Sequence, residues 1–272
     1  MIEYGIKLPP SVMHKIDAFF RDDHSVTDQI NPFNRHDIDI TAKFHLDTVT
    51  NRPPVLDGVY YPENEVKSTD AFYYEEFRRD LARNNWRPDT TSYPFRVRFS
   101  PQEIGDYTMI LTIETKGIPI TTTYASFNVV ASDHKGFLEQ GTNYKHLRYS
   151  KSKKSFMGAG QVIPWAEYED WYHTDAAAGP VKFMPMYAAF KKLNEASGNF
   201  TRFVAAPWFM QLEWEGLGNY KPKMGQAWEF DRMNERCTDL DIYYLFCGLL
   251  HSPLEWRSWE WYPWDFMGII LL

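Results

Sequence analysis

Apolar and polar residues alternate along several short segments in the first half of the chain. The alternation has a period of two in residues 38–46 and 95–99, and it returns in 107–114 and 124–130. This pattern predicts half-buried β-strands, because successive side chains of a strand point to opposite faces of a sheet. Strands at this spacing are typical of an immunoglobulin-like antiparallel β-sandwich, which we expect in residues 1–133.

One segment of the first half does not follow this alternation. Residues 72–83 combine aromatic positions with many Glu and Arg residues in a helix-like pattern. We expect a helical insertion in a loop here, with the charged side chains forming a solvated face.

In the second half, segments typical of buried strands alternate with segments of helical periodicity. The expected strands begin at Phe156, Thr201 and Ile242, and the expected helices cover 183–196 and 227–240. Strands that alternate with helices predict a parallel sheet with its functional loops at the carboxyl ends of the strands. Three candidate residues fall at those ends, namely Trp165, Trp208 and His251.

The second half is too short for a closed barrel. A (β/α)8 barrel of the TIM type needs about 250 residues, and positions 151–272 provide roughly half of that number. The predicted fold class is therefore a multidomain β plus α/β protein, in which an incomplete (β/α)8 barrel with its first three βα units follows the sandwich. The polar turn at 132–136 marks the expected boundary, so the truncated barrel domain covers 134–272. An unclosed barrel exposes a parallel edge, and we expect it to favour self-association.

Charge and hydropathy exclude two classes of partner. The net charge of −7 and the pI near 5.6 provide no basic stripe for a phosphate backbone, so no nucleic-acid partner is expected. No apolar run approaches the roughly 20 residues that span a bilayer, so no membrane partner is expected. The first residues show no charged leader before an apolar core, and no secretory signal is expected in this chain. Aromatic residues make up 17% of the chain, and flat rings serve either as core filler or as platforms for sugar rings.

The two cysteines and the histidines do not predict a metal or cofactor site. Cys237 and Cys247 lie among ordinary core residues, which favours free thiols, although a disulfide between them is geometrically allowed. The spacing of Cys and His residues matches no zinc motif. His36 lies near two Asp residues, yet alternation along a strand would separate it from both, so a polar strand face is the expected interpretation.

Several motifs together resemble a known family. The run YPFRVRFSPQEIGDY at 93–107, with SFNVV at 126–130 and GFL at 136–138, is similar to the sandwich domain of unknown function that precedes the barrel in many bacterial glycoside hydrolases. In such enzymes a small hairpin and the first barrel strand come next, and segments 146–149 and 151–158 resemble them. The resemblance covers residues 5–265, and its most specific part is the Pro-Gln-Glu-x-Gly-x-Tyr turn.

The resemblance implies a function in carbohydrate metabolism, more exactly polysaccharide degradation by a cellulase-clan barrel. That clan carries its acid/base Glu after the fourth strand and its nucleophilic Glu after the seventh, and both strands lie beyond the three expected here. The implied role of Arg202 is to orient the nucleophile, and His251 resembles a substrate-binding histidine. The resemblance also suggests a secreted or periplasmic complete protein.

Three questions have two possible answers each. Glu213 and Glu215 share one face of an extended segment and would form a local acid and base pair, or they are two solvated carboxylates. Trp165 and Trp208 either stack on a glycan or pack in the core. The expected function is that of a glycoside hydrolase fragment acting on polysaccharide or oligosaccharide and inactive alone, with a noncatalytic carbohydrate-binding or interaction protein as the alternative.

Overall fold

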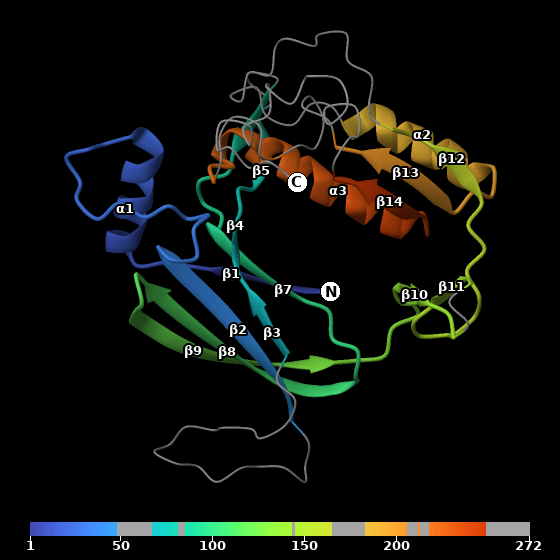
Figure 1. The fold of residues 1–272 in the computed structure, drawn as a ribbon, viewed down its shortest axis with the longest axis horizontal. Helices are drawn as coiled ribbons and strands as arrows, with labels where there is room; N and C mark the ends of the chain where they lie inside the picture. The colour runs from blue at the N-terminus through green and yellow to red at the C-terminus, as the bar shows by residue number, and fades with distance from the viewer. Residues whose placement is uncertain are drawn as a thin grey trace, which may run out of the picture. The chain divides into compact units, whose positions relative to one another are not determined.

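A computed structural model describes most of the chain. The described residues are 1–47, 67–80, 85–142, 145–164, 183–205, 212 and 218–248. They form a multidomain, β-rich protein with two compact units, and Figure 1 labels its helices and strands. Unit 1 contains residues 1–75 and 90–132, whereas unit 2 contains residues 76–89 and 133–272.

Unit 1 contains an antiparallel sheet of four strands, which confirms the alternation of the first half. Its order is β3 (Lys67–Asp70), β2 (Ile38–Asp47), β8 (Gly105–Thr115) and β9 (Ile118–Val129). β9 starts earlier than the expected 124–130, because a two-residue turn joins it to β8. Both turn residues, Lys116 and Gly117, have positive φ angles of 48° and 75°, as the favoured tight hairpin turns require.

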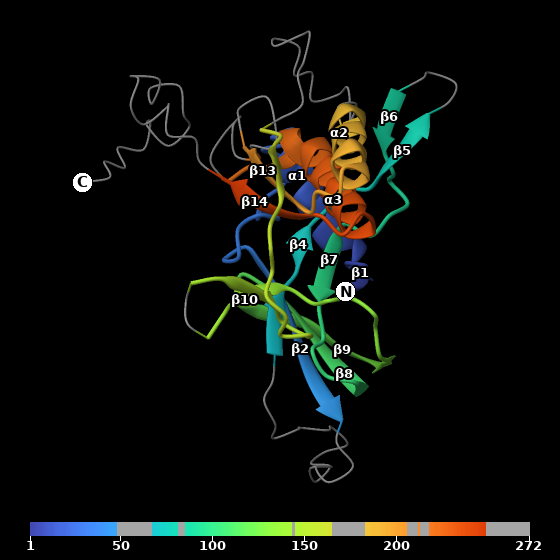
Figure 2. The ribbon, with the colours of Figure 1, turned by 90° about the vertical axis from the view of Figure 1, so that its right-hand side faces the viewer.

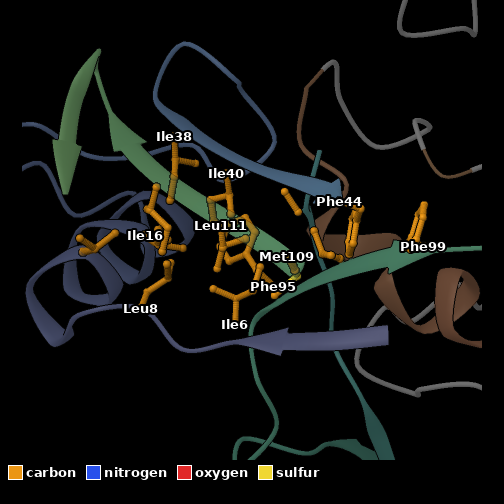
Figure 3. Close-up of a cluster of buried hydrophobic side chains, with 14 of the residues drawn as sticks. Ile6, Leu8, Ile16, Ile38, Ile40, Phe44, Phe95, Phe99, Met109 and Leu111 are labelled. Atoms are coloured by element: carbon orange, nitrogen blue, oxygen red, sulfur yellow. The ribbon is translucent and has the colours of Figure 1, made fainter. Parts of the chain in front are cut away.

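A second antiparallel sheet shares its core with the first. Its order is β1 (Ile2–Ile6), β7 (Phe95–Phe99) and β4 (Phe72–Tyr73). One cluster of buried side chains contains residues of both sheets, as Figure 3 shows. Phe44 of β2 stacks on Phe99 of β7 with ring centroids 4.0 Å apart. The apolar positions of the two sheets therefore form one continuous core.

A helix that the strand pattern did not predict completes this core. α1 (Pro10–Arg21) has Pro at its first turn, where the missing N–H costs nothing, and it ends at Asp22 in the left-handed conformation. Its buried residues Val12 and Ile16 join the cluster between the sheets. The helix is only 12 residues long, so its apolar stripe is short.

The Pro-Gln-Glu-x-Gly-x-Tyr turn enters β8 through a specific hydrogen bond. The hydroxyl of Tyr107, at the third position of the strand, donates to the backbone carbonyl of Glu103 at 3.3 Å. Gly105 has a φ of +147°, and a Cβ atom there would lie 2.8 Å from Leu46. The spacing of Glu, Gly and Tyr in this motif is thus set by one corner of the backbone.

The expectation of a helix at 72–83 is wrong. The described residues there form β4 and β5 (Phe77–Asp80), and β5 pairs with β6 (Asn85–Pro88), which follows the segment. Phe72 and Tyr74 share a face two residues apart, with ring centroids at 6.0 Å, which is the period of a strand. Cross-strand pairing of charges replaces the solvated helix face, because Arg87 Nε lies 3.1 Å from Asp80 Oδ2.

Unit 2 contains the expected alternation of strands and helices. The parallel sheet has the order β12 (Gly160–Val162), β13 (Phe200–Val204) and β14 (Tyr243–Cys247), with α2 (Phe183–Glu195) and α3 (Met224–Asp239) between its strands. Figure 2 shows α2 and α3 side by side next to this sheet. Phe190, Phe203 and Met233, each fully buried, join α2, β13 and α3 in one cluster, so both helices cover the same face.

The first parallel strand is shorter than the sequence pattern suggests. Phe156 lies before β12 and packs against other rings, and pairing with β13 begins only at Gly160. A Cβ atom at Gly160 would lie 1.6 Å from the carbonyl oxygen of Phe200. The close approach of the two backbones therefore requires glycine at this position.

The hairpin of β5 and β6 is anchored on α3 within unit 2. Trp228 Nε1 donates to Glu76 Oε1 at 2.6 Å, and its ring lies against Trp86 at 5.1 Å and Phe77 at 6.1 Å. The backbone N–H of Asp89 donates to the carbonyl of Glu76 at 2.7 Å and closes the base of the hairpin. One buried indole thus holds a segment that is distant in sequence.

We predict that Trp228→Ala destabilises unit 2 by about 3–5 kcal/mol, as the loss of a buried aromatic ring does. Trp228→Phe keeps a ring and loses only the hydrogen bond to Glu76, so its cost should be about 1.5–3 kcal/mol. Urea unfolding followed by circular dichroism measures both values, and trypsin cleavage after Arg78 reports release of the hairpin. Equal stability of wild type and Trp228→Ala would show that the hairpin does not depend on α3.

A second prediction concerns His45 of β2, which is 5% exposed and whose two ring nitrogens have no hydrogen-bond partner. Burial lowers the pKa of His45, Lys43 lowers it further, and Asp47 opposes the shift. The unfolded chain therefore binds a proton more readily than the folded chain, and stability should fall as the pH drops below about 6.5. Thermal unfolding between pH 8 and pH 5 should show a smaller decrease for His45→Leu than for wild type. His36→Leu at an exposed position is the matched control, and an equal decrease in all three proteins would contradict the prediction.

Candidate functional site

The carboxyl edge of the parallel sheet is level across its three strands. The backbone N–H of Val204 donates to the carbonyl of Pro164 at 2.9 Å, and the N–H of Ala205 donates to the carbonyl of Cys247 at 2.8 Å. Pairing therefore continues past the ends of β12 and β13, to Pro164 and Ala205. In open and closed parallel sheets, ligands bind at this edge because the loops that follow the strands converge there.

Arg202 lies in the middle of this sheet, on the face opposite α2 and α3. The parallel register places it between Val162 of β12 and Leu245 of β14. Val162 is 56% exposed and Leu245 is 51% exposed, and Arg202 is exposed as well. The next residue, Phe203, points to the other face and is fully buried. Strand alternation alone therefore separates the charged group from the helix-covered core.

The guanidinium of Arg202 contacts a thiol at the carboxyl edge. Arg202 Nε donates to Cys247 Sγ at 3.1 Å, and this is its only side-chain hydrogen bond to a described residue. Cys247 is a free, partly exposed cysteine. The contact uses the Nε–H, which is one of five guanidinium N–H donors. The four N–H donors on the two terminal nitrogens, which can bind a carboxylate, take no part in this contact.

The amino end of the same sheet is closed by a cluster of rings. The cluster connects β11 (Leu147–Tyr149) to the sheet and contains Tyr149, Phe156, Phe200 and Tyr243. Tyr243 also donates its hydroxyl to the carbonyl of Gly136 at 3.0 Å, and burial raises the pKa of Tyr243. Lys135 pairs with Asp241, and this hydrogen bond raises the pKa of Lys135. These groups hold the hairpin of β10 (Leu138–Gln140) and β11 in place at the amino end of the sheet.

Two buried titratable groups of the helix-covered cluster, Cys237 and Tyr244, are held in their neutral forms. Burial raises the pKa of the Cys237 thiol to about 12 and that of the Tyr244 phenol to about 12. Tyr244 also donates a hydrogen bond to Asn234. Neither group ionises near neutral pH, so these two side chains contribute to packing.

Of the residues predicted from the sequence, the structure places one at this edge. Arg202 lies on β13 as expected. The other candidates lie outside the described residues, and these are Trp165, Trp208, Glu213, Glu215 and His251. The sequence pattern predicts a core position for Cys247, whereas the structure places it beside Arg202. Only the pairing register of β13 and β14 reveals that contact, because 45 residues separate the two side chains.

The described part of the chain contains neither a cluster of metal ligands nor a membrane-spanning helix. No group of three or more His, Cys, Asp or Glu residues within it could hold a metal ion. No helix among the described residues is long and apolar enough to cross a membrane. The cysteines there are both free.

Comparison with known proteins found one similarity, and it concerns the fold. No family model and no curated protein matches the chain. Among solved structures, a proposed glycoside hydrolase from Bacteroides vulgatus is similar, with a TM-score of 0.53 and 13% sequence identity. The alignment covers 90% of this chain and 39% of that chain. At this identity the likeness concerns the fold alone, and it shows a glycoside hydrolase-like, multidomain β-rich fold.

We predict that the two thiols differ strongly in reactivity with a disulfide reagent at pH 8. Cys247 is partly exposed, whereas Cys237 is buried with a raised pKa, and the thiolate is the form that reacts. The native protein should release one equivalent of reporter, and denaturant should release the second. Cys247→Ser should abolish the native signal. Two equivalents released together from the native wild type would show that Cys237 is not buried in the cluster between the helices and the sheet.

Proposed function

We propose that the chain is an immunoglobulin-like β-sandwich (1–133) followed by a hairpin and the first three βα units of a cellulase-clan (β/α)8 barrel (134–272). The proposed function is that of part of a glycoside hydrolase that acts on a polysaccharide or oligosaccharide. Residues 1–272 by themselves do not hydrolyse glycosidic bonds in this proposal.

One observation carries the proposal for the barrel. Three parallel strands appear in the order β12, β13, β14, with a helix after each of the first two, and both helices cover the same face. A doubly wound sheet would place helices on both faces, whereas a barrel keeps them on the outer face. The ring cluster at the amino end and the open carboxyl edge agree with the polarity of barrel enzymes.

The corner at Tyr107 supports the sandwich. A Tyr near the start of a strand, whose hydroxyl bonds to the backbone a few residues upstream, is a hallmark of immunoglobulin-like sandwiches. Tyr107 makes such a bond to the carbonyl of Glu103, and two antiparallel sheets share the core around it.

The roles proposed for side chains concern the carboxyl edge. Arg202 positions a carboxylate through the guanidinium donors that the contact with Cys247 leaves over. Trp165 and Trp208 stack on sugar rings, and His251 binds the substrate. Hydrolysis needs two carboxyl groups about 5–5.5 Å or 6.5–9.5 Å apart across one glycosidic bond, which the proposal assigns to later strands of a complete barrel.

The test is a screen of purified residues 1–272 against aryl glycosides and polysaccharides, together with affinity electrophoresis in glycan-containing gels. We expect no turnover and a slight retardation on at least one polymer, because two stacking rings support roughly millimolar affinity. Trp208→Ala should reduce the retardation, and Trp86→Phe in the β5 and β6 hairpin is the matched control.

Three results would overturn parts of this proposal. Turnover that disappears in Glu213→Gln or Glu215→Gln would assign the chemistry to that local pair. Free migration on every polymer would reject the sugar-binding role of Trp165 and Trp208. If the chain is retarded on a polymer, and neither it nor longer versions of it hydrolyse any glycan of the screen, a noncatalytic carbohydrate-binding protein is favoured.

A further inference from the structure

The two edges of the four-stranded sheet in unit 1 differ in length and charge. β3 has four residues, begins at Lys67 and ends at Asp70, whose carboxylate binds Arg35 at 3.0 Å. β9 has 12 residues and contains no charged side chain, and the chain stays uncharged up to Ser132. Exposed sheet edges are normally kept short, charged or covered, since they otherwise pair with another chain. β3 follows this rule, and β9 does not.

The protective features of β9 are confined to its first residues. Pro119 lacks a backbone N–H, and the pairing with β8 shifts between Ile113 and Glu114. From Thr121 to Val129 the register with β8 is continuous. No described strand pairs with the opposite edge of β9, and the side chains from Thr121 to Tyr124 are all exposed. This segment combines β-branched residues with an aromatic residue, which are the types that favour strand pairing.

We propose that β9 pairs with β9 of a second copy of this chain in an antiparallel, two-fold arrangement. Each copy carries a net charge of −7, so two copies approach at the lowest electrostatic cost along an uncharged strand. Lys116 precedes the strand and Asp133 follows it. Antiparallel pairing brings Lys116 of each copy towards the opposite charge of Asp133 in the other copy. Lys116 would then give up its exposed contact with Asp28, at 3.5 Å, within its own copy. Parallel pairing would instead place lysine beside lysine.

The centre of this interface lies near Thr123 and Tyr124. Tyr124 pairs in register with Ile110 of β8, on the face opposite the core, and it is 49% exposed. Across a two-fold axis each Tyr124 faces its own symmetry mate, and aromatic cross-strand pairs stabilise such sheets. The pairing joins two four-stranded sheets into one continuous sheet and closes as a dimer, because a two-fold interface uses the same surface on both copies.

The test is sedimentation velocity of the full chain over a range of micromolar concentrations, with Tyr124→Lys as the variant. Wild type should show a concentration-dependent dimer, and two facing ammonium groups should weaken dimerisation about tenfold or more. Ser68→Lys places the same charge on β3, the other edge, and should leave the dimer unchanged. Thermal unfolding of each variant verifies that the fold is intact.

A second measurement tests the geometry. In a Cys247→Ser background, Tyr124→Cys should form an intermolecular disulfide on mild oxidation, because residues that face each other across antiparallel strands lie within reach of a disulfide. Ser68→Cys should not. A wild-type monomer at every concentration would overturn the proposal. So would a dimer that persists in Tyr124→Lys and disappears in Leu245→Lys, because that result would place self-association at the parallel sheet.

Discussion

Burial of the Phe203 side chain, on the face of β13 that α2 and α3 cover, fixes which side chains of the parallel sheet lie on each face. The side-chain period of a strand is two, so a slip of one residue would bring Arg202 into the apolar cluster and expose Phe203. Placing a guanidinium there without a partner would cost several kcal/mol. Because β13 is the central strand, its register also aligns Val162 and Leu245 beside Arg202. The position of the Arg202 charge on the face away from the helices, and its contact with Cys247, both follow from this one constraint.

The two ends of the parallel sheet differ for a related reason. At the amino end, Tyr149 and Phe156 from the hairpin region pack on Tyr243 at 5.6 Å and 5.3 Å, and the three rings form one cluster. At the carboxyl end, backbone hydrogen bonds extend beyond β12 and β13, from Val204 to Pro164 and from Ala205 to Cys247. Side-chain packing therefore defines one end of the sheet, and backbone pairing defines the other.

Unit 1 shows how one sheet can have two edges of different character. Its core joins both sheets through apolar positions of β2, β7 and β8, so stability does not depend on the exposed side chains of β9. The outer edge of that strand was therefore under no packing constraint to be uncharged. An uncharged edge of this length is easier to understand as a surface for strand pairing than as a product of folding alone.

The sequence by itself determined the elements whose periodicity is long and regular. The alternation at 38–46 and 95–99, and the helical period at 183–196, each correspond to an observed element, since a period of two or of 3.6 follows directly from backbone geometry. The elements and contacts that the sequence pattern mispredicted or missed depend on residues that are distant in the sequence. The segment 72–83 forms strands because β4 pairs with β7 and β5 pairs with β6. The helix α1 is short, so its local pattern is weak, and only its packing in the core of unit 1 identifies it. The contact between Arg202 and Cys247 depends on the register of β13 and β14. Local patterns encode which face of an element is apolar, whereas the tertiary structure alone decides which other element covers that face.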